Sequence, residues 1–420
     1  MNKIFASIIT IGDELLIGQV IDTNSAWIAQ ELNKIGVPVK HRVAVGDVWD
    51  DIWNALDEET KHADIIFITG GLGPTADDIT KPLLCKYFGG KMVLDQPTLE
   101  HVTYLFEHVF KRPMPLSDRN AKQAEVPDVC TVLKNEQGTA PGMLFEKNGK
   151  IFISLPGVPH EMKWITTNHV LSIITKKFNT GFIEHRTLLT AGIGESYLAD
   201  KIKNFEEALP SEIKLAYLPN YGMVRLRLTI FGTDKNKITQ LIDHQFSLLK
   251  ENVKDVMVVD EDLSMEEVVG KLLTQKNKTI ATAESCTGGS IASLLTSVPG
   301  SSKYFMGSIV SYDNSIKEKV LHVKKETLET FGAVSEETVK EMVQNVLNIM
   351  QTDYAIAVSG IMGPDGGTTE KPVGLVWIAI ADNKKIITKK FNFRFDRNRN
   401  IQLTATNALN LIRQLIVDNS

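Results

Sequence analysis

Short apolar runs alternate with amphipathic stretches over the first 165 residues of the chain. Apolar residues at helical spacing predict helices over residues 23–34 and 51–61, with Thr23-Asn24 as the expected cap of the first and Gly36 as its end. The β-branched runs that predict buried strands lie at residues 4–11, 39–45, 64–69 and 150–155. This alternation of strands and helices predicts a largely parallel sheet covered by helices.

The pattern changes in the middle of the chain and returns near residue 263. Residues 170–255 follow the order strand–helix–strand–strand–helix, which is typical of a small ferredoxin-like α+β module. After residue 263, helices again alternate with apolar strands, and a closing helix is expected over residues 400–417. The predicted fold class is therefore α/β, with two three-layer α/β/α domains joined by the small module. The expected boundaries are 1–169, 170–258 and 259–420.

Composition narrows the class of protein. With 43% hydrophobic and 23% charged residues in 420, the chain has the balance of a soluble globular protein. A formal net charge of −5, without a basic stripe, argues against direct contact with nucleic acid. Three cysteines without a C-x-x-C pair argue against a disulfide framework and suit a reducing cytoplasm. No apolar stretch has the length of a membrane span, and no signal peptide is expected.

The stretch from Ala283 to Ser290 joins a predicted strand to a predicted helix and carries several reactive groups. Ser285 is a candidate nucleophile at the tip of this turn. Gly288 and Gly289 let the backbone approach a ligand closely, so the N–H groups from Thr287 onward are candidate oxyanion donors. The alternative interpretation is an ordinary helix start with Thr287 as its cap.

A second polar group follows the strand predicted at 305–312 and should reach the same sheet edge as Ser285. It contains Tyr312, Asn314 and Lys317. A serine needs a base near it, and no histidine stands in a motif here. A lysine with a lowered pKa can act as that base, with the tyrosine relaying the proton. Cys286 is the rival nucleophile, and we expect only one of the two neighbours to face the pocket.

Polar residues in the N-terminal domain also follow predicted strands, where ligands bind in parallel sheets. Asp77 and Asp78 are expected in the first turn of a helix, either as favourable charges at the helix dipole or as ligands of a divalent cation. The candidate metal ligands are Glu14, Asp77, Asp78 and Glu161, with Asp22 as a possible addition. The candidate nucleotide-binding residues are Asn24, Gly70, Gly71, Gly73 and Thr75.

Three motifs in this half resemble a known family. They are Ile-Gly-Asp-Glu-Leu-Leu-x-Gly at 11–18, Thr-Gly-Gly-Leu-Gly-Pro-Thr-x-Asp-Asp-x-Thr at 69–80 and Pro-Gly-Val-Pro-x-Glu-Met at 156–162. They resemble the molybdopterin-binding type domain at the front of the CinA family. The resemblance implies hydrolysis of ADP-ribose to AMP and ribose 5-phosphate with a divalent metal (Mg, Mn or Co). The alternative is a non-catalytic nucleotide-binding or assembly module.

The last domain carries five further motifs of the same family. They are Ala-Glu-Ser-Cys-Thr-Gly-Gly at 283–289, Ser-Tyr-x-Asn-x-x-Lys at 311–317, Gly-Ala-Val-Ser at 332–335, Ser-Gly-Ile-x-Gly-Pro-x-Gly-Gly at 359–367 and Lys-Pro-Val-Gly at 371–374. The resemblance implies a nicotinamide-nucleotide amidase without a cofactor, which converts nicotinamide mononucleotide and water to nicotinic acid mononucleotide and ammonia. It also implies a homodimer.

The resemblance assigns roles residue by residue. Ser285 is the implied nucleophile, with Tyr312 and Lys317 as its partners, and Arg397 is favoured over Arg399 for holding the phosphate. Met362 stands where the family usually has alanine, which can change the shape of the pocket. The expected substrate-binding residues are Thr287, Gly288, Gly289, Asn314, Gly360, Thr368, Thr369 and Arg397.

Overall fold

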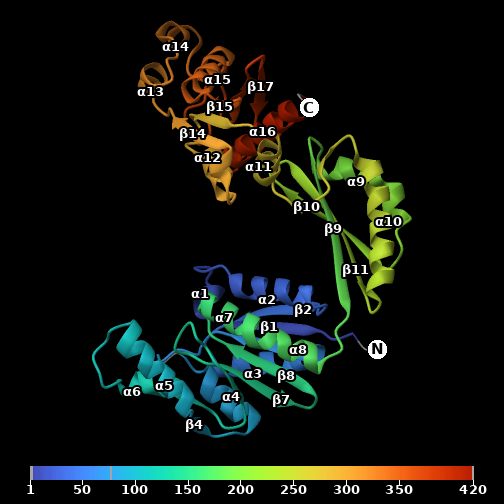
Figure 1. Cartoon of the computed structure of the whole chain (residues 1–420), viewed down its shortest axis with the longest axis vertical. Helices are drawn as coiled ribbons and strands as arrows, with labels where there is room; N and C mark the ends of the chain where they lie inside the picture. The colour runs from blue at the N-terminus through green and yellow to red at the C-terminus, as the bar shows by residue number, and fades with distance from the viewer. Residues whose placement is uncertain (1–2, 76–77, 419–420) are drawn as a thin grey trace. The chain divides into compact units, whose positions relative to one another are not determined.

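The computed structural model describes residues 3–75 and 78–418, which form two compact units (Figure 1). Unit 1 comprises Met1–Glu184 and Ile230–Gln240, and unit 2 comprises His185–Thr229 and Leu241–Ser420. Asp77, one of the expected metal ligands, lies outside the described residues.

A six-stranded sheet forms the centre of unit 1. Its strand order is β2-β1-β3-β8-β7-β6, in which the first four strands are parallel and the last two run antiparallel to their neighbours. Every residue of β1 and β3 is buried, as expected for central strands covered on both faces. The strands are β1 (Ala6–Ile11), β2 (Val39–Val45), β3 (Ile65–Thr69), β6 (Thr131–Leu133), β7 (Gly142–Lys147) and β8 (Lys150–Leu155).

Helices cover both faces of this sheet, so the predicted three layers are present (Figure 1). One face is covered by α2, α7 and α8, and the other by α3 and α4. Asp22 caps α2 by accepting a hydrogen bond from Ser25 N (2.9 Å), so the expected Thr23-Asn24 cap is wrong by one residue. The helices are α1 (Asp13–Leu16), α2 (Thr23–Lys34), α3 (Trp49–His62), α4 (Thr80–Phe88), α7 (Pro159–Ile165) and α8 (Leu171–Lys177), with a π-helical turn, η3 (Thr166–Val170), between the last two.

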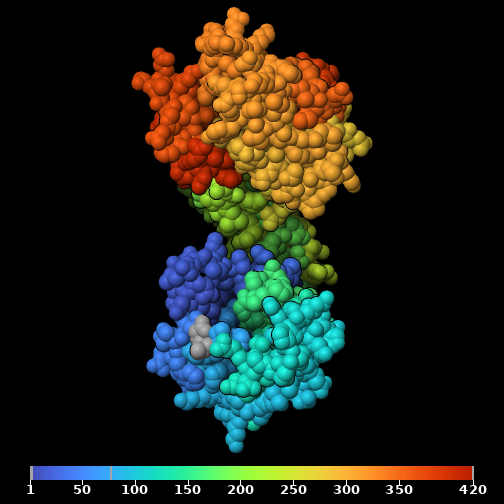
Figure 2. All heavy atoms as spheres, turned by 90° about the vertical axis from the view of Figure 1, so that its left-hand side faces the viewer, coloured from blue at the N-terminus to red at the C-terminus, as the bar shows by residue number. Residues whose placement is uncertain are grey.

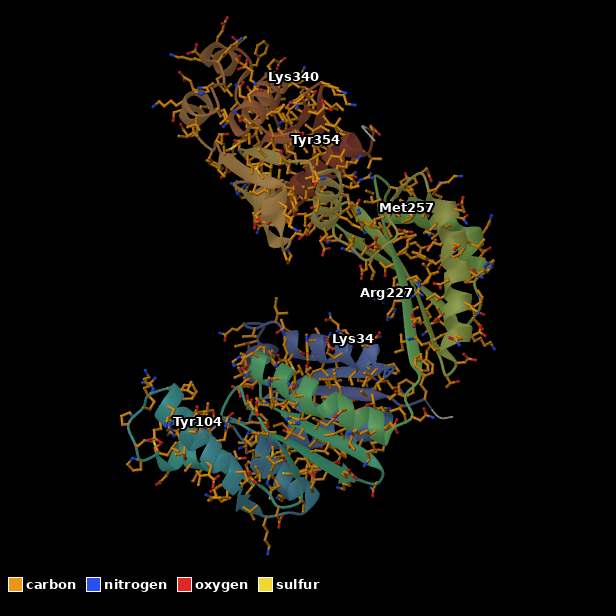
Figure 3. The ribbon with its side chains drawn as sticks, in the orientation of Figure 1. Lys34, Tyr104, Arg227, Met257, Lys340 and Tyr354 are labelled. Carbon is orange, nitrogen blue, oxygen red and sulfur yellow. The ribbon has the colours of Figure 1, made fainter. Side chains whose placement is uncertain are left out.

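Residues 92–130 form a group of short elements whose bounds the sequence analysis does not predict. They belong to the cyan surface of unit 1 in Figure 2. Tyr104, at the end of α5, is 55% exposed (Figure 3). The elements are β4 (Met92–Leu94), α5 (Gln96–Tyr104), the π-helical turn η1 (Leu105–Val109), α6 (Asp118–Ala121), η2 (Lys122–Ala124) and β5 (Glu125–Pro127), with β4 and β5 paired.

The small module has the order βαββαβ and a four-stranded sheet, β10-β11-β9-β12. This agrees with the predicted ferredoxin-like arrangement, and it adds a short closing strand, β12, which the sequence analysis does not include. The elements are β9 (Phe182–Ala191), α9 (Glu195–Glu207), β10 (Ile213–Asn220), β11 (Met223–Gly232), α10 (Lys235–Val253) and β12 (Met257–Val259).

The main sheet of unit 2 has the order β14-β13-β15-β16-β17, with three parallel strands followed by two antiparallel ones. Helices α11, α12 and α16 cover one face, and α15 covers the other, where small alanines such as Ala281 and Ala355 let it approach closely. The strands are β13 (Ile280–Glu284), β14 (Phe305–Val310), β15 (Tyr354–Gly360), β16 (Leu375–Asp382) and β17 (Ile386–Asn392).

The closing helix of unit 2, α16, begins one turn before the expected Asn400. The helices of this part of unit 2 are α11 (Met265–Lys276), α12 (Ser290–Ser297), η4 (Ser301–Lys303), α13 (Asn314–Lys319), α14 (Lys325–Phe331), α15 (Glu336–Met350) and α16 (Arg397–Asp418). Among the described residues, no helix combines the length and the apolar character needed to cross a membrane.

Candidate functional site

A cavity of about 180 Å³ lies at the carboxyl edge of the unit 2 sheet. It forms there because β13, β14 and β15 are parallel neighbours, so the loops that follow them meet at one edge. The expected residues that line it are Ser285, Tyr312, Asn314, Lys317, Gly360 and Arg397. Sequence segments more than 100 residues apart therefore supply one pocket, which we call the Ser285 pocket.

Ser285 and Cys286 both line this pocket, so the expectation that only one of them faces it is wrong. Both are nearly buried, with 8% and 6% of their surface exposed. Burial raises the pKa of the Cys286 thiol to about 12, so this group is protonated at neutral pH. This environment therefore disfavours Cys286 as a thiolate nucleophile.

Lys317 is fully buried, with 1% of its surface exposed. Its Nζ donates to the backbone oxygens of Ser311 (2.7 Å) and Tyr312 (3.2 Å). Burial lowers the pKa of Lys317 below its ordinary value of 10.5, against a smaller opposing effect of Cys286 and Asp313. A buried lysine with a lowered pKa is the base that the sequence analysis requires.

Tyr312 and Arg397 lie together at the mouth of the pocket. Arg397 donates through Nη2 to Tyr312 Oη (3.1 Å) and through Nη1 to Gly363 O (2.8 Å). The tyrosine is 63% exposed, so its hydroxyl is accessible from solvent. Within the described chain, no hydrogen bond joins Ser285 Oγ to Lys317 Nζ or to Tyr312 Oη. Such catalytic contacts often tighten only when substrate is bound.

Two polar residues that the sequence analysis does not identify hold the loops around the pocket. Ser359 donates to Ala333 O (2.7 Å) and lines the pocket. Asn400 is fully buried and donates to the backbone oxygens of Met362 (3.1 Å) and Phe395 (2.9 Å). Met362 also lines the pocket, so the departure from the family pattern does affect its wall.

Glu284, directly before Ser285, is a third residue that the sequence analysis leaves without a role. It is fully buried, and its carboxylate accepts from Thr287 Oγ1 (2.7 Å) and from three backbone N–H groups at the start of α12. These N–H groups belong to Gly289 (3.1 Å), Ile291 (3.0 Å) and Ala292 (2.8 Å). The carboxylate therefore satisfies the N-terminus of α12 and fixes the turn that carries Ser285.

This contact corrects the expected oxyanion donors and helix cap. Gly289, rather than Thr287, is the N-cap of α12, and its N–H is used by Glu284. The N–H of Gly288 donates to Ser285 O (3.2 Å). In the part of the chain that the structure describes, the N–H groups of Cys286 and Thr287 have no acceptor, and they replace Gly288 and Gly289 as the candidate donors.

Thr368 and Thr369, two of the expected substrate-binding residues, do not line the Ser285 pocket. Thr368 instead closes its own loop, because its N–H donates to Lys371 O (2.8 Å) and its hydroxyl accepts from Lys371 N (3.0 Å). Of the residues expected to hold the phosphate, Arg397 is the one that lines the pocket.

Replacing Glu284 should affect both stability and turnover. We expect Glu284→Ala to lower the free energy of unfolding by about 3 kcal/mol or more, because several buried donors lose their acceptor. Glu284→Gln keeps one acceptor oxygen, so it should fold and show a lowered kcat with little change in KM. Urea unfolding and steady-state kinetics measure both effects. Glu337→Gln, an exposed carboxylate in the first turn of α15, is the matched control. An unchanged kcat for Glu284→Gln would refute the positioning role.

A smaller cavity of about 140 Å³ lies at the carboxyl edge of the unit 1 sheet and is lined by Glu14, Asp22, Asn24 and Thr69. Asn24 donates to Gly157 O (2.7 Å) and, more weakly, to Thr69 Oγ1 (3.4 Å). Its Oδ1 is buried and has no partner among the described residues. A buried acceptor without a donor is suited to a ligand. We call this cavity the Asn24 pocket.

The glycine-rich loop of unit 1, which begins at Gly70, is held by hydrogen bonds within its own segment. Asp78 precedes α4 instead of lying in its first turn, and it accepts from Gly73 N (2.8 Å) and Thr75 N (2.8 Å). Gly70 (φ +116°) must be glycine, because a Cβ there would lie 2.2 Å from Ile11 O, and Gly71 is crowded by Thr80 in the same way. Gly70, Gly71, Gly73 and Thr75 do not line the Asn24 pocket.

The expected metal ligands that the structure describes do not lie together. Glu14 lines the Asn24 pocket, Asp78 is engaged by the glycine loop, and Glu161 accepts from Asn135 Nδ2 (2.6 Å). Burial raises the pKa of Glu161, which disfavours its charged form. Outside residues 1–2, 76–77 and 419–420, no three His, Cys, Asp or Glu side chains are close enough to hold a metal ion. The described carboxylates therefore do not form the single centre that the sequence predicts.

Comparison with known proteins gives matches along the whole chain. The family models are "Probable molybdopterin binding domain" over residues 7–176, "Damage-inducible protein CinA KH domain" over 185–257 and "CinA C-terminal domain" over 262–416. A CinA-like protein of Flavobacterium psychrophilum is 47% identical over 415 residues, covering 99% of both chains. One of Cytophaga hutchinsonii is 48% identical over 414 residues, covering 98% of both chains.

Among solved structures, the competence damage-inducible protein A of Klebsiella pneumoniae subsp. pneumoniae MGH 78578 is 32% identical. It covers 37% of this chain and 98% of its own, with a TM-score of 0.36. The full-length relatives and the three consecutive family models agree with the motifs at both sheet edges. The chain belongs to the CinA family.

Proposed function

We propose that the Ser285 pocket is the active site of a nicotinamide-nucleotide amidase, which hydrolyses nicotinamide mononucleotide to nicotinic acid mononucleotide and ammonia. The observation that carries this proposal is the convergence of Ser285, Tyr312, Lys317 and Arg397 on one cavity from three separate segments. Hydrolysis of the carboxamide of a nucleotide requires a nucleophile, a base and a cation that binds the phosphate.

The hydrogen bonds of Lys317 support its role as the base. A neutral lysine amine has two N–H groups and one lone pair. The carbonyls of Ser311 and Tyr312 take up the two N–H groups. The lone pair then remains for the proton of Ser285 Oγ. Because burial favours the neutral amine, a larger fraction of Lys317 than of an exposed lysine is unprotonated at a given pH and available as a base.

The reaction proceeds in two steps. Ser285 Oγ attacks the carboxamide carbon, its proton passes to Lys317, and the N–H groups of Cys286 and Thr287 stabilise the oxyanion. The carbon–nitrogen bond breaks as the leaving nitrogen takes a proton from Lys317, directly or through Tyr312, and ammonia departs. Water then attacks the acyl-enzyme, which releases the nicotinate product and restores Ser285 and Lys317.

The direct test is ammonia release from nicotinamide mononucleotide by the purified chain in the presence of excess EDTA. We expect release at the same rate with and without the chelator, because every step above uses groups of the chain itself. A folded protein that releases no ammonia would refute the proposal.

Arg397 should determine affinity for the phosphate of the substrate. Replacing it with glutamine should raise KM for nicotinamide mononucleotide about 10- to 100-fold, because a charge-assisted contact is lost. KM for nicotinamide riboside, which has no phosphate, should change little. Arg399→Gln is the matched control, because Arg399 stacks on Phe395 (3.9 Å to the ring centre) and does not line the pocket. A larger effect of Arg399→Gln would reverse the assignment.

We further propose that unit 1 acts on ADP-ribose or a related dinucleotide at the Asn24 pocket. The unpartnered Oδ1 of Asn24 supports a ligand there. The described carboxylates do not lie close enough together to hold one metal ion. AMP release from ADP-ribose, measured with and without Mn²⁺, separates a pyrophosphatase from a module that only binds. Binding of ADP-ribose without release of AMP would instead indicate a module that binds the nucleotide and does not hydrolyse it.

We also propose that the small module does not bind nucleic acid, although one family model calls it a KH domain. KH domains clamp nucleotides with a G-x-x-G loop. Residues 185–257 contain no G-x-x-G sequence, and the turn before α9 reads Gly192-Ile193-Gly194-Glu195. Together with the net charge of −5, this favours a connecting role.

A further inference from the structure

The main sheet of unit 2 ends on one side at β14, beyond which no further described strand pairs (Figure 1). The sequence of β14, Phe-Met-Gly-Ser-Ile-Val at 305–310, contains neither a charged residue nor a proline. An edge strand carries backbone N–H and C=O groups that point away from the sheet and can pair with another strand. Natural proteins usually protect such an edge with charged side chains, with proline or by keeping the strand very short. β14 has none of these protections.

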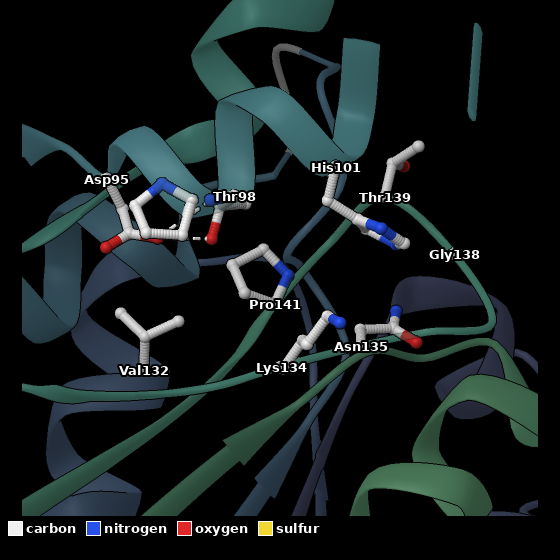
Figure 4. A pocket seen from close by; sticks show the side chains of 10 residues that line it. Asp95, Thr98, His101, Val132, Lys134, Asn135, Gly138, Thr139 and Pro141 are labelled. Atoms are coloured by element: carbon white, nitrogen blue, oxygen red, sulfur yellow. Dashed lines mark hydrogen bonds between the residues drawn. The ribbon is translucent and has the colours of Figure 1, made fainter. Parts of the chain in front are cut away.

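The other edge strands of the described chain are protected in these ways. β4, β5 and β12 have three residues each. β6 also has three, and its Val132 shares a cavity of about 260 Å³ with His101 of α5 (Figure 4). The longer edge strands carry charges or a proline, namely Lys40 and Arg42 in β2, Lys214 and Pro219 in β10 and Lys389 and Lys390 in β17.

The exposed side chains of β14 are apolar. Met306 and Val310 are each 45% exposed. The register with β13 passes from Phe305 directly to Gly307, so Met306 stands opposite no residue of β13, and residues 307–310 then pair regularly. The segment that follows β14 adds three more exposed apolar side chains, Tyr312, Ile316 and Val320. An apolar, unpaired edge of this kind is suited to burial against another strand.

Charges at the two ends of β14 indicate which strand pairs with it. Lys303 lies just before the strand and Asp313 lies just after it, and both are exposed. Neither forms an ion pair with a described residue, although Asp313 caps α13 by accepting from Ser315 N (2.8 Å). A second β14 that runs antiparallel brings the positive end of each strand beside the negative end of the other. A parallel copy would instead place like charges together.

We propose that two copies of this chain associate through β14, with the two strands paired antiparallel across a twofold axis beside Ser308. An axis at this position places Met306 opposite the partner's Val310 and directs Lys303 toward the partner's Asp313, because the members of each pair lie equally far from Ser308 along the chain. The two sheets then form one continuous sheet, and neither β14 remains an edge. A twofold interface must be self-complementary, and the apolar and charged residues of β14 meet this condition.

The test is sedimentation velocity of the full chain, without substrate, at micromolar concentrations. We expect the wild type to sediment as a dimer of about 93 kDa, twice the 46.7 kDa of one chain. Met306→Lys and Val310→Lys give β14 the kind of charge that protects β17, so each should raise the dissociation constant at least about tenfold. Ile387→Lys adds a lysine at an exposed apolar position of β17, and this matched control should leave the association unchanged.

Cross-linking tests the register of the two strands. The double variant Met306→Cys/Val310→Cys should form a covalent dimer on mild oxidation, because the two positions face each other in the proposed pairing. Each single variant should cross-link far less, since the same position of the two copies lies on opposite sides of the axis. Lys303→Glu should weaken the dimer at low salt and weaken it less at high salt, because it brings like charges together at both ends.

Three outcomes would overturn this proposal. The first is a wild-type chain that stays monomeric throughout the micromolar range. The second is an equal dissociation constant for the wild type, Met306→Lys and Val310→Lys, which would place the dimer contact on another surface. The third is a double cysteine variant that still dimerises and does not cross-link. Thermal unfolding identifies a variant that has lost its fold. These measurements use no substrate, so they test the interface separately from the proposed amidase activity.

Discussion

Replacing Ser285 with alanine should lower the rate of ammonia release from nicotinamide mononucleotide by at least about a thousandfold. The substitution removes the attacking oxygen and leaves the turn intact, since Glu284 continues to hold the start of α12. Substrate binding should persist, because Arg397 lies on another element. The measurement is single-turnover ammonia release, together with a binding titration of the inactive variant.

Cys286→Ala is the matched control for this prediction. Cys286 lines the same pocket, but burial raises the pKa of its thiol to about 12, so the thiol carries no nucleophilic charge at neutral pH. We expect this variant to keep most of the activity and to lose some stability, because the side chain packs in the core of unit 2. Loss of activity in Cys286→Ala with retention in Ser285→Ala would reverse the assignment of the nucleophile.

Replacing Lys317 with arginine should lower the rate about 10²- to 10⁴-fold, the range expected for loss of a general base. Arginine keeps the positive charge but does not deprotonate in this pH range. In the wild type, the neutral lysine is the active form, so the rate should fall as pH falls through the pKa of Lys317. Since burial lowers this pKa, the midpoint of the rising limb should lie below 10.5.

A pH–rate profile of kcat/KM for nicotinamide mononucleotide measures this effect. Lys319→Arg, an exposed position on the same helix, should leave both the rate and the profile unchanged. A wild-type profile without a rising limb below pH 10.5, or an unchanged profile in Lys317→Arg, would contradict the role of Lys317 as the base.

The sequence by itself determined the fold class and most of the Ser285 pocket. Strong periodic patterns identified the central strands and the covering helices, because β1, β3 and β13 are buried on both faces and consist of apolar or small residues, apart from Glu284 at the end of β13. Ser285 directly follows β13, and the segment with Tyr312, Asn314 and Lys317 follows β14. Neighbouring parallel strands end at one edge of the sheet. Local sequence was therefore enough to predict that these residues would meet.

Only the tertiary structure decided how the polar groups are used. The Glu284 carboxylate accepts hydrogen bonds from three backbone N–H groups at the start of α12. One of them, the N–H of Gly289, was expected from the sequence to stabilise an oxyanion. Asp78 and Glu161 are engaged by Thr75 and Asn135, and not by one another. Such pairings depend on side-chain direction and on contacts between distant segments, and neither is encoded in hydrophobic period or in motif spacing.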